Sequence, residues 1–152
     1  MISFLKSLLS DGASANPTTQ DEAHIATAAL LIEAALSDDD YQDVERNAIV
    51  NVLVRHYRIS DTEARDLVRV AEKAQAESEQ LFYFTRTVKD SFPIETRVQM
   101  IEMLWEIAYA DGKLSKFEAN LVRRIAGLIY VSDRDRGDAR KRVVARLGIE
   151  DD

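Results

Sequence analysis

The stretch WEIAYADGKLSKFEAN, residues 105–120, indicates the fold most clearly, because an earlier part of the chain carries a second copy of it. That copy is IEAALSDDDYQDVERN, residues 32–47, in which Glu33 stands 73 residues before its equivalent, Glu106. Each copy has the pattern of a helix, an acidic turn and a second helix. A helical unit that occurs twice predicts two similar halves packed about a pseudo-twofold axis.

A second pair of turns supports the repeat. RISDTEARD, residues 58–66, matches YVSDRDRGD, residues 130–138, at a spacing of 72 residues. In the first turn, Ser60 and Glu63 have the spacing of a capping box, in which each side chain accepts a hydrogen bond from the other residue's backbone N–H. In the second turn, Ser132 is expected to begin the last helix.

Apolar residues recur at helical spacing through most of the chain, and no segment alternates in the manner of a strand. The sequence therefore predicts an all-α fold, a helical bundle of about seven to eight helices with two pseudo-symmetric halves. Pro93 is expected in the first turn of one helix and Gly148 at the end of the last. The apolar residues expected in the core or half-buried include Leu31, Ile32, Ile49, Leu53, Leu67, Val68, Phe82, Tyr83, Phe84, Ile94, Val98, Ile101, Leu104, Trp105, Ile125, Ile129, Val143 and Leu147.

The length of 152 residues fits one domain. Residues 1–20 are expected to form a short amphipathic helix and a small, polar linker, and residues 21–150 the helical domain. The absence of cysteine excludes disulfides and thiolate metal sites. His24 and His56 are expected to be surface or capping residues.

A net charge of −7 argues against nucleic acid as a partner. No apolar run is long enough to span a membrane, and the first residues make a poor secretory signal, so a cytoplasmic location is expected. Residues 1–10 have an apolar face but one lysine, which gives weak attraction to lipid. We expect this segment to dock on a groove of the same or a neighbouring protomer, with membrane association only indirect, and its deletion to leave the domain folded.

The turn in the later copy looks like part of a calcium loop. With Gly112 at the sixth position of an EF-hand, the first and third positions fall on Ile107 and Tyr109, which supply no carboxylate. The turn is therefore not an EF-hand. Ser115 and Glu118 instead have the spacing of a second capping box.

A composite acidic site is the alternative to this capping role. If the pseudo-twofold axis brings the two acidic turns together, their carboxylates can hold a hard cation, Mg²⁺, Ca²⁺ or Mn²⁺. No histidine stands near either turn in the sequence, which disfavours zinc. The candidate metal ligands are Glu33, Asp38, Glu45, Glu106, Asp111 and Glu118.

The segments EIAYADG and DGKLSKFE, with the weaker first copy EAALSDDDYQDVE, resemble the tellurite resistance protein B-like (TerB-like) family over about residues 24–148. The family is related to the N-terminal domain of DjlA-type co-chaperones, but this chain has no HPD tripeptide, so that activity does not carry over. The resemblance implies an all-α fold with pseudo-symmetric halves and a link to stress or tellurite resistance, often beside membrane-associated or metal-related partners. The acidic positions of the family map onto Asp38, Glu45, Asp111 and Glu118, although the first turn lacks the glycine.

From these observations we expect a non-enzymatic helical interaction module that binds protein partners and needs no cofactor. The first alternative is a module that binds or senses a divalent metal through the duplicated acidic turns. A weaker alternative is a carboxylate-bridged metallohydrolase, which needs the same cluster and an open coordination position. A homodimer is left open.

Overall fold

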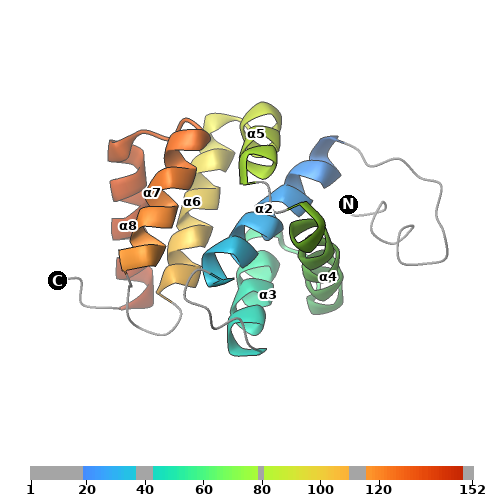
Figure 1. The fold of residues 1–152 in the computed structure, drawn as a ribbon. Helices are drawn as coiled ribbons and strands as arrows, with labels where there is room; N and C mark the ends of the chain where they lie inside the picture. The colour runs from blue at the N-terminus through green and yellow to red at the C-terminus, as the bar shows by residue number, and fades with distance from the viewer. Residues whose placement is uncertain (1–18, 37–42, 79–80, 110–115, 149–152) are drawn as a thin grey trace.

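The computed structural model of the chain describes residues 19–36, 43–78, 81–109 and 116–148. These ranges contain seven α-helices and no strand (Figure 1), which confirms the predicted all-α class. The expected helix within residues 1–20, and the division of the chain at residue 20, fall largely outside the described residues and stay predictions. The helices are α2 (Thr19–Leu36), α3 (Asp43–Tyr57), α4 (Asp61–Ser78), α5 (Leu81–Ser91), α6 (Ile94–Ala108), α7 (Lys116–Leu128) and α8 (Asp133–Leu147).

Helix α2 is the centre of the core. Between Ala23 and Ala35 every side chain is buried except those of Ile25 and Glu33, which are half-buried. A helix that is apolar all round must be covered all round, and α2 contacts α3, α4, α5, α6 and α7. Its many alanines let those neighbours approach closely, which explains why α2 shows no single apolar stripe.

The two halves are the units α2–α3–α4 and α6–α7–α8. In each unit the first helix packs against the third, α2 against α4 and α6 against α8. The units meet where α6 contacts α2 and α3, and α5 covers α2 and reaches α7. Figure 1 shows α6, α7 and α8 together on the left and α4 on the right, with α2 crossing between them and α3 below α2.

The backbone confirms that the two Ser-Asp turns are equivalent. Arg58 and Tyr130, which are 72 residues apart, both have the left-handed conformation, with φ of 54° and 59°. The next residue in each turn, Ile59 or Val131, is buried. A left-handed non-glycine residue is uncommon, so its occurrence at matching positions shows that both halves leave one helix and enter the next in the same way.

The predicted caps of these turns are confirmed. The Ser60 Oγ accepts from the Glu63 backbone N–H at 3.0 Å, and a Glu63 carboxylate oxygen accepts from the Ser60 N–H at 3.2 Å. The Ser132 Oγ accepts from the Asp135 N–H at 3.1 Å, and Gly148 ends α8 with φ of 67°. Pro93 is the N-cap of α6, one position before the first turn in which it was expected.

Several predictions about burial are wrong. Phe82 and Tyr83 were expected in the core or half-buried, but both are exposed because they lie on the outer side of the start of α5. Ile94 is the first residue of α6 and Leu147 the last of α8, and both are exposed too, because a side chain at a helix end has neighbouring turns on one side only. Among the described helices, none is long and apolar enough to cross a membrane.

Candidate functional site

Glu106 is a buried carboxylate where three helices meet. Its side chain is 2% exposed, on a part of α6 that is otherwise apolar. Its Oε2 accepts a hydrogen bond from the Arg55 Nη2 of α3 at 3.0 Å, and its Oε1 lies 3.2 Å from the His56 Nε2. The Arg146 Nη2 of α8 donates to the same Oε1. Glu106 therefore ties α3 of the first half to α8 of the second.

Gln99 of α6 contacts the other side of the His56 ring. The His56 Nδ1 lies 3.1 Å from the Gln99 Nε2, about two turns of α6 before Glu106. The His56 ring therefore lies between the Gln99 amide and the Glu106 carboxylate, and each of its nitrogens contacts one of them.

The surrounding donors keep Glu106 ionised. Burial alone would raise the pKa of this carboxyl, but the hydrogen bond and charge of His56, the charge of Arg55 and the hydrogen bond from Arg146 outweigh it and hold the pKa below its usual value. The pKa of Arg146 is raised. Burial alone would lower it, but the hydrogen bonds and charges of Glu102 and Glu106 raise it by more. Glu106 is thus an anion with both oxygens already bound.

Glu102, one turn earlier in α6, continues this network towards the surface. Its Oε1 accepts from the Arg146 Nη1 at 2.9 Å, and its Oε2 from Arg142 at 3.3 Å. Both arginines are about half exposed. The facing sides of α6 and α8 are therefore held together by a ladder of ion pairs.

At the equivalent position in the first half, the glutamate is paired with a neutral amide. Glu33 accepts a hydrogen bond from the Gln75 Nε2 of α4 at 2.9 Å. In both halves a glutamate thus joins the first helix to the third. Of the two glutamates, only Glu106 contacts arginine side chains in the described chain.

The predicted metal ligands are only partly in view. Asp38 and Asp111 lie outside the described residues, and the side chain of Glu118, in α7, is outside them too. Glu45 lies near the start of α3 and is half-buried. In the described part of the chain, no three histidine, aspartate or glutamate side chains are grouped to hold a metal. The composite acidic site stays a prediction, and at Glu106 a metal would have to displace Arg55, His56 or Arg146.

The two histidines are not the surface or capping residues that were expected. His24 is buried beside the rings of Tyr57 and Phe92, with centroids 4.5 and 5.9 Å away. Burial lowers its pKa, against a smaller opposite effect of Asp21. His56 is half-buried in the Glu106 network. The sequence around His56 did not indicate this role, because its partners Gln99 and Glu106 lie 43 and 50 residues away in the sequence.

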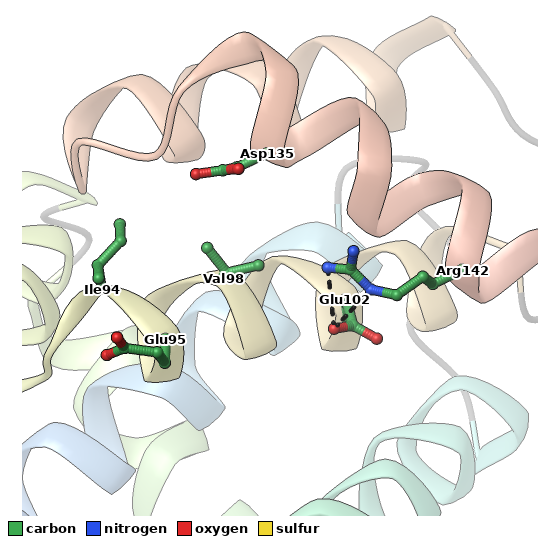
Figure 2. A pocket seen from close by; sticks show the side chains of 6 residues that line it. All are labelled: Ile94, Glu95, Val98, Glu102, Asp135 and Arg142. Carbon is green, nitrogen blue, oxygen red and sulfur yellow. Dashed lines mark hydrogen bonds and ion pairs between the residues drawn. The ribbon is translucent and has the colours of Figure 1, made fainter.

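A groove lies between α6 and α8, next to the Glu102–Arg142 ion pair. It is open to solvent, has a volume of about 430 Å³ and is lined by Ile94, Glu95, Val98, Glu102, Asp135 and Arg142. Figure 2 shows Ile94 and Val98 projecting from α6 toward α8, with Asp135 facing them from α8. The apolar side chains form the floor and the charged ones the rim.

The carboxylates on the rim of the groove differ in whether they have a partner. Glu102 is bound to Arg142 and Arg146. The carboxylates of Glu95 and Asp135, in contrast, make no hydrogen bond or ion pair with the rest of the described chain. Both lie in the first turn of their helices, where the helix dipole favours a negative charge. The groove therefore presents an apolar floor between two unneutralised acids.

The comparison with protein families covers most of the chain. The family model described as tellurite resistance protein TerB matches residues 24–141, which run from α2 into α8 and so include both halves. No curated protein and no solved structure gives a significant match. The chain belongs to the TerB tellurite resistance family.

Proposed function

We propose that the chain is a non-enzymatic helical interaction module of the TerB family, and that the groove between α6 and α8 is its docking surface. The observation that carries the proposal is the apolar floor of Ile94 and Val98 between the unpaired carboxylates of Glu95 and Asp135. An apolar cleft with a few directing charges is typical of a binding site.

The groove favours an amphipathic protein segment with basic side chains. An apolar side chain of the partner would bury the floor of the groove, and a lysine or arginine of the partner would neutralise Glu95 and Asp135. The net charge of −7 attracts the same kind of partner at longer range. The arginines near the groove, Arg142 and Arg146, are already paired with Glu102 and offer little to an acidic partner.

The state of the buried acid supports a binding role over catalysis. A general acid or base works best with a pKa near the working pH and with reach to a substrate. The pKa of Glu106 is shifted the other way, and both of its oxygens are held by side chains of the chain itself. Its role is to join α3, α6 and α8.

The proposal is tested by titrating the chain with a short synthetic peptide that has leucines on one face and lysines on the other. We expect saturable binding, with NMR shifts concentrated at Ile94 and Val98, that weakens as salt is added. Glu95→Gln and Asp135→Asn should each weaken binding by about two- to five-fold, the range for exposed ion pairs. Ile94→Ser, at an exposed position, should cost about tenfold through lost apolar contact.

Asp90→Asn is the matched control, because Asp90 is an exposed acid on α5 and does not line the groove. It should leave the affinity unchanged. Binding that is absent, or that responds equally to Asp90→Asn and to the groove variants, would show that the groove is not the docking surface.

A further inference from the structure

We propose that residues 1–9 of the same chain occupy the α6–α8 groove, so that an external partner must displace this segment. The inference rests on the groove being the docking surface proposed above. It names the segment that competes for it.

The sequence of residues 1–9 suits the groove. Ile2, Phe4, Leu5, Leu8 and Leu9 fall on one side of a helix, and the only charged residue, a lysine at position 6, falls at the edge of that side. The segment thus offers apolar side chains for the floor and a cation for the acidic rim. It lies outside the described residues, so its docking is inferred from this complementarity.

The place where the described chain begins makes the docking possible. Near its start, α2 lies against the junction of α5 and α6, because the rings of His24 and Phe92 are 5.9 Å apart. Phe92 is two residues before Ile94, at the end of the groove. Thr19 precedes His24 by about 7.5 Å along the helix.

The linker is long enough to reach the groove. Residues 10–18 join the apolar segment to α2, and nine residues span at most about 30 Å when extended. The groove therefore lies within reach of the segment in the same molecule, at a high effective concentration that a separate partner lacks.

The test places a nitroxide label on the segment and observes the groove. Because the chain has no cysteine, Ser7→Cys gives a single labelling site, on the side of the segment away from its apolar residues. The full chain is used, with isotope-labelled methyl groups. We expect strong broadening of the Ile94 and Val98 methyl signals, lost when Leu5→Asp and Leu8→Asp are introduced together.

A mixed sample identifies the molecule that supplies the segment. One chain carries the nitroxide and a second carries the isotopes. Broadening at the groove in the mixed sample as strong as in the doubly labelled chain would assign the segment to a second copy and overturn the inference. The mixed sample should show little broadening if the segment docks in its own molecule. Absence of broadening in the doubly labelled chain would overturn the inference too.

The leucine–lysine peptide separates this inference from the proposed function. If the docked form outnumbers the free form about ten to one, the Leu5→Asp/Leu8→Asp chain should bind the peptide about tenfold more tightly than the wild type. Peptide binding at the groove without nitroxide broadening would refute the intramolecular contact alone. Broadening without peptide binding, even in the released variant, would refute the external docking role alone.

Discussion

At the scale of single residues, Glu106 links the two halves of the chain. The helix that carries it supplies an otherwise apolar surface, so an unpaired carboxylate there would be costly. Arg55 and His56 of α3 and Arg146 of α8 offset that cost through their contacts with the carboxylate. One side chain therefore couples the first unit to the second.

The contribution of Glu106 can be compared with that of Glu33, its equivalent in the repeat. Glu106→Gln removes a charge that three side chains contact, and we expect it to lower the free energy of unfolding by about 1–3 kcal/mol. Glu33→Gln changes a contact with a neutral amide and should cost less than about 1 kcal/mol. Urea unfolding of the wild type and both variants measures the difference. Equal costs would show that the cations around Glu106 add nothing.

The same residue predicts a dependence on pH. The pKa of Glu106 is lowered in the folded chain from an ordinary value of 4.5. Its ionised form therefore stabilises the fold above about pH 4.5, and this stability is lost as the pH falls through the lowered pKa. The loss of unfolding free energy below pH 4.5 should be smaller in Glu106→Gln. A wild type and variant with parallel pH profiles would contradict this assignment.

At the scale of elements, the helix ends follow local rules while the helix surfaces depend on distant partners. Ser60 and Ser132 cap α4 and α8 with bonds that span three residues, so the sequence alone predicted them. The exposed Phe82, Tyr83 and Ile94 were wrongly placed inside because periodicity shows which residues share a face, but not how far a neighbouring helix covers it. The groove lies between the start of α6 and the facing residues of α8, which the sequence pattern did not predict.

The two serine N-caps can be compared by substituting each with alanine. Ser60→Ala and Ser132→Ala should each lower the unfolding free energy by about 0.5–2 kcal/mol, because an N-cap oxygen is lost. The cost at Ser60 should be the larger, since of the two serines only Ser60 also donates its backbone N–H to the carboxylate of the residue three positions on, and loss of the Oγ bond weakens this reciprocal pair. Denaturant unfolding tests the order. A Ser60 variant as stable as the wild type would show that this capping box is neutral.

At the scale of the whole molecule, the repeat was predictable and the network was not. The two copies share acidic turns and Ser-Asp turns in the sequence, and the matching left-handed residues Arg58 and Tyr130 confirm the second of these. The partners of Glu106 are separated from it by 40 to 51 residues, and no sequence pattern specifies which arginine or histidine will arrive there. The packing of α3 and α8 on α6 determines which side chains lie next to Glu106.

The acidic turns give a prediction for the whole fold. If they hold a divalent cation, Ca²⁺ or Mg²⁺ should raise the melting temperature of the wild type, since a ligand that binds the folded state stabilises it. Asp38→Asn and Asp111→Asn should each abolish the rise. The measurement is melting temperature against metal concentration for the three chains. A flat curve for the wild type would leave the turns with capping roles alone.

Docking of a basic amphipathic segment in the α6–α8 groove can be tested by exchanging the charges on its rim. The probes are the leucine–lysine peptide and a matched leucine–glutamate peptide, and calorimetry gives the affinity of each for the wild type and for the chain with Glu95→Lys and Asp135→Lys. The wild type should prefer the lysine peptide by about tenfold or more and the double variant the glutamate peptide, because the floor of Ile94 and Val98 is unchanged and only the rim is reversed. The same preference in both chains would contradict the claim.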